Sequence, residues 1–295
     1  MIKLHTKRLI IRDPIESDLQ DWHRLFSNPQ GMYYLDDIMT HSLEESRQNL
    51  ETAIAESQNS NRMKYFFSIE HKETGEFIGS IGYTVTEVTP PGMHVGAGYF
   101  LLPEHHGHGY ATEAMKEIVR FAFEDNGVYR LNSGCLAENR ASERVLQKSG
   151  LIKEAERKQY TWHDGRMKDR VEYRLLKDEY FNYWYALDTL VAKTTLQIDR
   201  PKGSAHPRYP EFIYPINYGC LEGTTAMDGG GIDVWQGSDP AQKLDAIMCI
   251  VDLTKNDSEI KLLIGCTEEE KQLVYQVHNE TAVMKGILIR RENFQ

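Results

Sequence analysis

A turn with two glycines stands directly before the most regular amphipathic segment of the sequence. Gly107 and Gly109 fall within the stretch EHHGHGYATEA, where glycine lets the backbone turn tightly and bring its N–H groups to face one point. The helix expected to follow adds unpaired N–H donors and a partial positive charge at its start. These features predict an anion site suited to a pyrophosphate group, with a plain tight connection between two elements as the alternative.

The elements around this turn predict a mixed α/β organisation. Residues 65–70 and 77–84 form a hairpin around the turn KETGE, and residues 94–102 form a further strand. Apolar residues recur at helical spacing from Ala111 to Phe123, with charged residues on the other face. Downstream, residues 129–135 are a strand, and Asn139 is the expected N-cap of a helix that ends before Gly150.

Composition bounds the classes of protein to which the chain can belong. Its 295 residues favour two domains, and 40% hydrophobic with 26% charged residues excludes wholesale disorder. The net charge of −10 and the lack of a polybasic run argue against nucleic acid or an anionic membrane as the main partner. No apolar stretch is long enough for a membrane span, and the four scattered cysteines argue against a zinc site or disulfide framework. Because the N-terminus also lacks an apolar signal core, we expect a cytoplasmic protein.

Several segments together resemble the GNAT superfamily of acetyl-CoA-dependent N-acetyltransferases. They are the opening TKRLIIRDPIESDLQDWHRLF, the cradle HHGHGYATEAM, the helix start ENRASERVLQKSGL and the closing DGRMKDRVEYRLL. The closer likeness is to the branch that acetylates the N-termini of ribosomal proteins, and it covers residues 1 to about 178. The resemblance implies an α/β fold, a mixed sheet with flanking helices that splays between the strands 94–102 and 129–135.

The same resemblance implies that acetyl-CoA lies in this split, with its thioester carbonyl near Leu101 or Leu102. His106 stands where the family motif has Gln or Arg, but the cradle binds pyrophosphate through main-chain donors. The implied contacts to acetyl-CoA are Leu101, Leu102, His106, Gly107, His108, Gly109, Tyr110, Ala111, Thr112 and Asn139.

Acetyl transfer to an amine also needs a proton for the departing thiolate and a neutral attacking amine. Ser142 matches a serine that serves as the thiolate acid in relatives, although simple helix capping explains a serine there equally well. The carboxylate that many relatives carry before a Gly-Tyr pair is absent from Gly96-Ala97-Gly98-Tyr99. His94 is therefore our candidate base, with Glu87 and Glu113 as the alternatives.

The second half of the chain is turn-rich and strand-like. We place the boundary near residue 180, giving an acetyltransferase domain at 1–179 and a small, mainly-β barrel domain at 180–295.

The segments IDRPKGSAHPRYP, FIYPINYG and MDGGGIDVW resemble the soluble inorganic pyrophosphatases, which use magnesium. The resemblance implies metal ligands at Asp199, Asp228, Asp233 and Asp257, and phosphate contacts at Lys202, Arg208 and Tyr218. One inner aspartate of the family loop is replaced by Gly230 and its proline by Gly231.

The resemblances imply an N-acetyltransferase that moves an acetyl group from acetyl-CoA to a primary amine, either a protein N-terminus or a small molecule. They also imply a second domain that hydrolyses inorganic pyrophosphate with Mg²⁺ if it is active. The alternative is a non-catalytic CoA- or phosphate-binding sensor or assembly protein with a degenerate pyrophosphatase barrel. The oligomeric state stays open, with a homodimer among the options.

Overall fold

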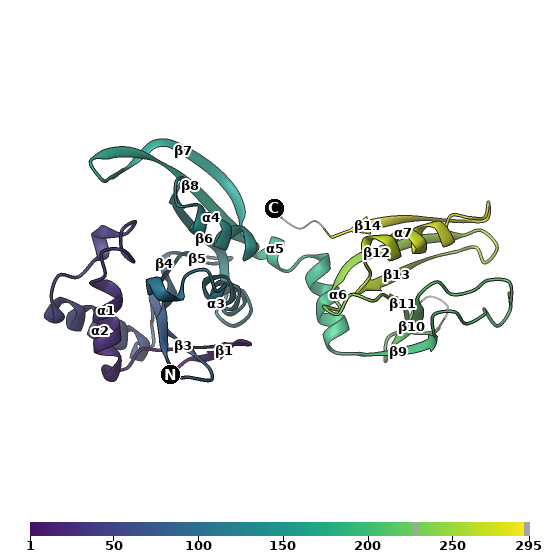
Figure 1. Ribbon diagram of the computed structural model, residues 1–295, viewed down its shortest axis with the longest axis horizontal. Coiled ribbons are helices and arrows are strands. Elements are labelled where there is room, and N and C mark those ends of the chain that lie inside the picture. The colour runs from purple at the N-terminus through teal and green to yellow at the C-terminus, as the bar shows by residue number, and fades with distance from the viewer. Residues whose placement is uncertain (227–228, 292–295) are drawn as a thin grey trace. The chain divides into compact units, whose positions relative to one another are not determined.

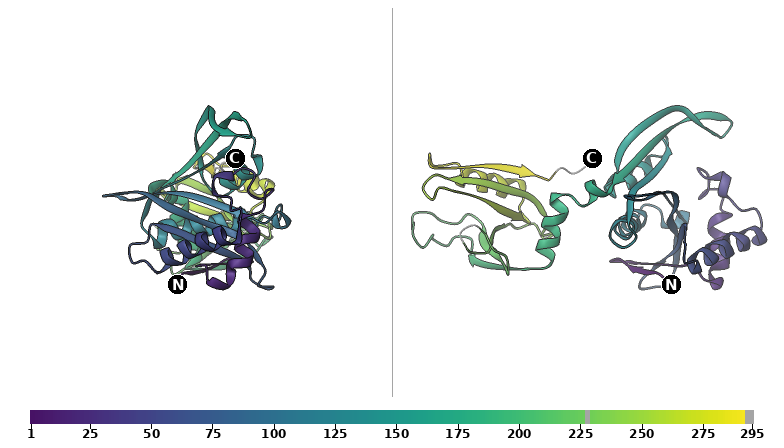
Figure 2. Two further views of the ribbon diagram at one scale, coloured as in Figure 1. Left: turned by 90° about the vertical axis from the view of Figure 1, so that its left-hand side faces the viewer. Right: turned by 180° about the vertical axis from the view of Figure 1, so that it is seen from behind.

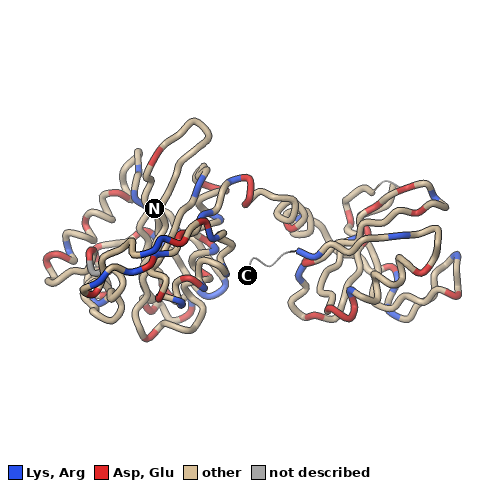
Figure 3. Tube along the Cα trace, turned by 90° about the horizontal axis from the view of Figure 1, so that it is seen from above, with Lys and Arg blue, Asp and Glu red and all other residues tan. Residues whose placement is uncertain are grey.

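The computed structural model describes residues 1–226 and 229–291, and they divide into two compact units (Figure 1). The first unit comprises Met1–Tyr180 and the second begins at Phe181. The division after Tyr180 lies one residue from the boundary that we placed between residues 179 and 180 from the sequence. Lys and Arg residues are interspersed with Asp and Glu along the trace of each unit (Figure 3). None of the helices described is long and apolar enough to cross a membrane.

The first unit is built on an eight-stranded mixed sheet in the order β1-β2-β3-β4-β5-β6-β8-β7. Its strands are β1 (Lys3–His5), β2 (Leu9–Arg12), β3 (Lys64–His71), β4 (Phe77–Thr89), β5 (Gly92–Leu101), β6 (Val128–Leu136), β7 (Ile152–His163) and β8 (Arg166–Leu176). All neighbours are antiparallel except β5 and β6, which run parallel. The predicted hairpin of residues 65–84 is confirmed as β3 and β4.

Helices cover both faces of this sheet (Figure 2, right). The helical elements are η1 (Glu16–Asp18), α1 (Leu19–Phe26), η2 (Asp36–Ile38), α2 (Leu43–Gln58), η3 (Pro103–His105), α3 (Tyr110–Arg120), the π-helical η4 (Phe121–Asp125), α4 (Arg140–Lys148) and α5 (Lys177–Tyr180). On one face α3 and α4 bury their apolar stripes against the sheet, and Met115, Ile118 and Leu146 are fully buried. On the other face, α1 and α2 form a second core around Trp22 and Leu102.

The two parallel strands separate along their length. Pairing of β5 with β6 extends only from Met93↔Val128 to Gly96↔Asn132. Beyond this point β5 continues to Leu101, and β6 continues to Leu136 in pairing with β8. The sheet of the first unit therefore carries the split that the resemblance implies.

The second unit is a six-stranded sheet with a helix against each face. Its strands are β9 (Thr195–Arg200), β10 (Asn217–Glu222), β11 (Ile232–Gln236), β12 (Leu244–Asp252), β13 (Asp257–Ile264) and β14 (Met284–Arg290), in the order β14-β12-β13-β11-β10-β9. Leu187 of α6 (Tyr183–Ala192) packs on one face, and Val274 of α7 (Glu268–Val277) packs on the other.

The expected barrel is not confirmed in this unit. Among the described residues, β9 and β14 each pair on one side only and lie at opposite edges of the sheet. A barrel buries one face of its sheet, whereas β13 buries consecutive residues from Lys261 to Ile264 and so has both faces covered. The helix α7, which the sequence analysis did not anticipate, covers one of those faces.

Candidate active site of the first unit

The glycine-rich turn joins the end of β5 to the start of α3. Gly107 and Gly109 have φ values of 80° and 79°, in the left-handed region where residues other than glycine are strained. Gly109 is the N-cap of α3 and offers no side chain to the first turn. The N–H groups of Tyr110, Ala111 and Thr112 thus have no capping side chain within the described chain. Amides without a capping side chain at a helix start are the donors that an anion site needs, and the predicted pyrophosphate contact stays a prediction.

The histidines of this turn contribute side chains to its frame. The His106 Nε2 atom lies 3.0 Å from the Leu101 carbonyl oxygen, so this ring turns toward the end of β5. The His108 ring stacks on Tyr110 with 5.7 Å between ring centroids. The side chain of His106 therefore contacts the end of β5, while the main chain of residues 106–111 forms the predicted cradle.

The edge of β5 that faces the split carries main-chain groups without a strand partner. The Ala97 carbonyl accepts a hydrogen bond from the Ser133 hydroxyl of β6 at 2.9 Å, so the main-chain groups of Ala97 point toward β6. Because alternate residues of a strand point to the same neighbour, the main-chain groups of Tyr99 and Leu101 also point into the split. Leu102 differs, since its N–H donates to the Ile78 carbonyl of β4 at 3.1 Å. Of the two predicted neighbours of the thioester, Leu101 faces the split and Leu102 does not.

A pair of hydroxyl groups spans the split where α4 begins. The Tyr99 hydroxyl of β5 lies 2.7 Å from the Ser142 Oγ atom and donates to the Ser142 carbonyl at 3.0 Å. Burial raises the pKa of the Tyr99 phenol well above its ordinary value, which keeps the group protonated. The Asn139 Oδ1 atom accepts from the Ser142 N–H at 3.1 Å and is the cap of α4. Since Asn139 is the cap, the Ser142 hydroxyl is available for Tyr99, and capping does not explain this serine.

Tyr99 is a site residue that the sequence analysis did not select. It was noted only as part of the Gly-Tyr pair in the central strand. Spacing carries no sign that its hydroxyl meets a helix 43 residues later in the chain. The thiol of Cys135 also lies at the start of α4, with its Sγ atom 3.8 Å from the Asn139 carbonyl oxygen. Burial raises the pKa of this thiol.

The three candidate bases do not lie at this hydroxyl pair. His94 is five residues from Tyr99 along β5, roughly 17 Å at the rise of a strand, in the part of β5 that still pairs with β6. Its Nδ1 atom lies 3.2 Å from the Glu87 carboxylate, so these two candidates contact each other. The assignment of His94 as a catalytic residue therefore stays a prediction, and it gains no support from this geometry.

Glu113 is also unsuited to act as a base. Its carboxylate accepts from the Thr6 hydroxyl at 2.6 Å, from the Arg8 N–H at 2.7 Å and from the Arg8 Nε at 2.7 Å. Burial acts to raise the pKa of Glu113, but these hydrogen bonds outweigh it and hold the pKa below its ordinary value. A carboxylate that accepts three hydrogen bonds, one of them from a guanidinium, has little proton affinity, and its role is structural.

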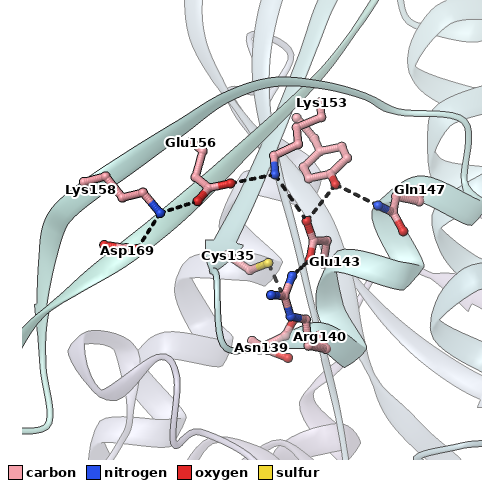
Figure 4. Close-up of polar contacts among 10 residues, drawn as sticks. Cys135, Asn139, Arg140, Glu143, Gln147, Lys153, Glu156, Lys158 and Asp169 are labelled. Atoms are coloured by element: carbon pink, nitrogen blue, oxygen red, sulfur yellow. Dashed lines mark hydrogen bonds and ion pairs between the residues drawn. The ribbon is translucent and has the colours of Figure 1, made fainter. Parts of the chain in front are cut away.

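A chain of polar contacts fixes α4 against the β7–β8 hairpin (Figure 4). Glu143, only 6% exposed, accepts from the Arg140 guanidinium at 2.7 Å and from the Tyr173 hydroxyl at 3.0 Å. Lys153 of β7 approaches the same carboxylate at 3.8 Å. Burial acts to raise the pKa of Glu143, yet the hydrogen bonds outweigh it and lower the pKa. The contacts then continue outward through Glu156, Lys158 and Asp169.

In the second unit, the predicted magnesium ligands do not come together. No three His, Cys, Asp or Glu side chains gather as a metal site in the part of the chain that the structure describes, and Asp228 lies outside that part. The Asp233 carboxylate pairs with the Lys261 ammonium, which also contacts Glu259 at 2.8 Å. A fixed ammonium next to Asp233 repels a second cation and takes the oxygens that a metal needs.

The other predicted ligands lie apart from Asp233. Asp257 is four residues from Lys261 along β13, roughly 13 Å away, and Asp199 lies two strands from Asp233, roughly 10 Å away. The Asp199 carboxylate accepts instead from the Cys220 thiol at 3.8 Å. The assignment of Asp199, Asp233 and Asp257 to one magnesium site is therefore corrected.

The predicted phosphate contacts of this unit are likewise dispersed. The Tyr218 hydroxyl accepts from the Lys261 Nζ at 2.9 Å, and burial raises its pKa far above the ordinary value. Lys202 and Arg208 are exposed loop residues, and the Arg208 N–H donates to the His206 ring at 3.1 Å. The structure joins Tyr218 to the ion pair of Asp233 and leaves the two basic residues in the loop.

The similarity of this chain to known proteins lies in its first unit. Residues 8–152 match the family model described as acetyltransferase (GNAT) domain. A protein of Bacillus subtilis (strain 168) described as an uncharacterized N-acetyltransferase, YoaA, is 29% identical over 174 residues, which is 59% of this chain and 96% of that protein.

Two solved structures show the same fold at low sequence identity. A ribosomal-protein-S5-alanine acetyltransferase from Vibrio fischeri has a TM-score of 0.54 at 20% identity, over 61% of this chain and 98% of that chain. A spermidine N-acetyltransferase from Vibrio cholerae, in complex with CoA and spermine, has a TM-score of 0.53 at 19% identity, over 60% of this chain and 100% of that chain. The first unit of this chain thus shares its overall fold with those two proteins.

Proposed function

From the premise that the first unit of this chain contains a GNAT acetyltransferase domain, we propose that the protein transfers the acetyl group of acetyl-CoA to a primary amine. The observation that carries the proposal is the split between β5 and β6, with the uncapped start of α3 at one end and the Tyr99–Ser142 pair beside it. Such a site offers main-chain donors for a pyrophosphate and a protonated hydroxyl for a leaving group.

Each part of acetyl-CoA has a matching part of the site. The N–H groups from Gly107 to Thr112 would hold its pyrophosphate, since α3 has no other cap. Its pantetheine arm would extend β5 as an added strand, because the main-chain groups of Tyr99 and Leu101 point into the split. The N–H of Leu101 would then be a donor close to the thioester.

In the transfer itself, the amine nitrogen attacks the thioester carbon, a C–N bond forms and the C–S bond breaks. Ser142 would give its proton to the departing sulfur, and the Tyr99 hydroxyl, held protonated by burial, would stabilise the serine oxygen through its 2.7 Å contact. After the thiol leaves, the serine would regain a proton from solvent. Asn139 holds the first turn of α4 in place for this exchange. The proton that the amine loses goes to solvent.

The acceptor is proposed only as a primary amine. The two similar structures are named as a spermidine acetyltransferase and a ribosomal-protein alanine acetyltransferase, and these names define a panel. The panel consists of spermidine, a peptide with N-terminal alanine, a peptide with N-terminal serine, and free amino acids.

The test is release of CoA from acetyl-CoA by the full chain in the presence of each amine. We expect saturable release with at least one acceptor, and a loss of about hundredfold in kcat for Ser142→Ala. Ser149→Ala is the matched control, because Ser149 lies at the other end of α4 and its hydroxyl has no hydrogen-bond partner among the described residues. Tight CoA binding with no turnover on any amine would reject the transferase and favour a CoA-responsive sensor.

We propose no hydrolase activity for the second unit. The Lys261 ammonium occupies the carboxylate that the pyrophosphatase resemblance assigns to magnesium. The full chain incubated with pyrophosphate and Mg²⁺ is therefore expected to release no phosphate above background. Release that disappears in an Asp233→Asn variant would overturn this conclusion.

A further inference from the structure

Arg8 reaches the cradle from a distant part of the chain. It stands just before β2 and meets the turn about a hundred residues later. Its Nη1 atom donates to the His108 carbonyl at 3.0 Å, and its guanidinium lies 4.6 Å from the centre of the Tyr110 ring. Its Nη2 atom is 3.6 Å from the point where a side chain on Gly109 would begin. A single guanidinium thus lies along one side of the cradle.

The guanidinium is itself held in one orientation. Its Nε atom donates to Glu113 at 2.7 Å, while the Arg8 main-chain N–H and the Thr6 hydroxyl bind the other carboxylate oxygen. Glu113 lies in the first turn of α3, so the arginine joins the helix to the loop that precedes it. Arginine suits this bridge because its planar fork donates in two fixed directions.

The bond to the His108 carbonyl has a consequence for the cradle. In a trans peptide the carbonyl of one residue and the N–H of the next point in opposite directions. With the His108 carbonyl bound to Arg8, the Gly109 N–H must point to the far side of the loop from the arginine. Gly109 has a positive φ and no side chain, so without this contact the peptide has wide freedom to rotate.

We propose that Arg8 is a positioning residue for the phosphate cradle. It fixes the peptide between His108 and Gly109 so that the Gly109 N–H is presented to the pyrophosphate of CoA. The inference rests on the proposed function, since it assumes that CoA is the ligand. Arg8 acts from behind the loop, and its charge is already neutralised by Glu113, so it orients donors and does not itself bind phosphate.

The test compares three ligands on the full chain by isothermal titration: CoA, dephospho-CoA and pantetheine. For Arg8→Ala we expect the affinity for CoA and for dephospho-CoA to fall equally, by about tenfold each, the effect of one lost charge-assisted hydrogen bond. Pantetheine has no pyrophosphate, so the affinity of Arg8→Ala for pantetheine is expected to stay within about twofold of the wild-type value. In turnover, the KM for acetyl-CoA should rise while kcat stays nearly unchanged.

Two further variants separate positioning from folding. Arg8→Lys keeps a positive charge for Glu113, but an ammonium donates from one point, whereas Arg8 reaches Glu113 from Nε and the His108 carbonyl from Nη1. CoA binding should therefore fall as in Arg8→Ala while the melting temperature is kept. Thr6→Val removes a different bond to Glu113 and leaves the His108 carbonyl bound, so CoA affinity should hold.

Three results would overturn the inference. They are an unchanged CoA affinity in both Arg8 variants, an equal loss for pantetheine, and a loss for CoA that exceeds the loss for dephospho-CoA. The last result would assign Arg8 to direct contact with the 3′-phosphate. A wild-type chain that fails to bind CoA would instead reject the proposed function, so the two failures are distinguishable.

Discussion

The Tyr99 hydroxyl has two contacts on one residue, the Oγ atom and the carbonyl oxygen of Ser142. Burial keeps the phenol neutral, so it remains a donor across the whole range in which amines are acetylated. Its place on the edge of the split means that it meets Ser142 only because β5 and β6 separate after Gly96. The tyrosine thus couples the serine hydroxyl to the strand that would hold the thioester.

We expect Tyr99→Phe to lower kcat by about tenfold, less than the loss in Ser142→Ala, because the phenol acts through the serine. Since the pKa of Tyr99 is raised, its removal should lower kcat by the same factor at every pH from about 7 to 9. The measurement is kcat against pH for both chains with saturating substrates. A loss that grows toward high pH would show that Tyr99 titrates in that range and is not a constant donor.

Glu143 gives a prediction about stability in acid. Its pKa is lowered in the folded chain, so its stabilising effect is fully present above its unfolded pKa of about 4.5 and is lost as pH falls through its folded value. Glu143→Gln should cost about 2 kcal/mol at neutral pH and remove this loss, because Gln does not titrate there.

The measurement is hydrogen exchange of residues 140–148 at several pH values below about 5. Glu156→Gln, at the exposed end of the same chain of contacts, is the control and should leave exchange in α4 nearly unchanged. Equal acid sensitivity in Glu143→Gln and the wild type would contradict the prediction.

Sequence spacing predicts the local contacts at this scale and misses the distant ones. Asn139 as the cap of α4 is confirmed, because the cap and its amide lie three residues apart. The contacts of Arg8 with Glu113 join residues about a hundred positions apart, and nothing in either segment encodes the partner. Sequence alone therefore leaves Glu113 as an alternative base, whereas the fold shows that Thr6 and Arg8 hold its carboxylate.

At the scale of the element, helix ends explain both a success and an omission. The expected cap Asn139 is found at the start of α4, where its side chain accepts from the Ser142 N–H at 3.1 Å. The same signal exists at Thr267, where a capping box with Glu270 opens α7, and the sequence analysis did not use it. The barrel was expected from the resemblance to pyrophosphatases, and a helix recognised at Thr267 would have indicated a covered sheet face instead.

The β7–β8 hairpin shows why the extent of strands is harder to predict. β7 extends from Ile152 to His163, although its sequence has no apolar alternation. The strand is held by its pairing with β8 and by ion pairs such as those of Lys158 with Glu156 and Asp169. A strand with both sides polar leaves no period-two pattern for sequence analysis to detect.

The cap of α4 yields a prediction for the element that positions the serine. Asn139→Ala should cost about 1 kcal/mol of local stability, because the Ser142 N–H loses its acceptor. Asn139→Asp keeps an acceptor at the helix start and should retain most of that stability. The measurement is hydrogen exchange across residues 140–148, with kcat as the second readout. A stable α4 in Asn139→Ala would show that the Glu143 contacts alone fix the helix.

At the scale of the whole molecule, each unit has hydrophobic clusters of its own. The first unit ends with Tyr180, whose ring stacks on Phe123 at 5.0 Å and whose hydroxyl donates to Glu124 at 2.6 Å. This last residue therefore belongs to the core of the first unit, although it directly precedes the second.

A chain that ends after Tyr180 should accordingly keep the melting temperature and the CoA affinity of the first unit. A chain that ends after Leu176 loses the Tyr180 contacts and the ion pair of Glu179 with Arg174, and should melt several degrees lower. Calorimetry of both truncations against the full chain is the measurement. Loss of CoA binding in the longer truncation would show that the second unit supports the site.

The second unit should be sensitive to acid, because the pKa of its buried His278 is strongly lowered. His278 accepts a hydrogen bond from the Trp235 indole at 3.1 Å, and burial, with a smaller effect of Lys261, lowers its pKa to about 3. The folded ring stays neutral while the unfolded ring takes up a proton below about 6.5. Stability is thus fully present above pH 6.5 and falls as pH drops toward 3, by about 1.4 kcal/mol per pH unit.

The second unit should then lose about 2 kcal/mol between neutral pH and pH 5. His278→Gln keeps an acceptor for Trp235 but cannot be protonated, and it should flatten this dependence. His206→Gln is the control, because its loop ring is less buried and should change the slope less. Denaturant unfolding of the three chains at pH 5 and pH 7 decides the matter. An equal slope in His278→Gln and the wild type would mean that the buried ring is not what makes the second unit sensitive to acid.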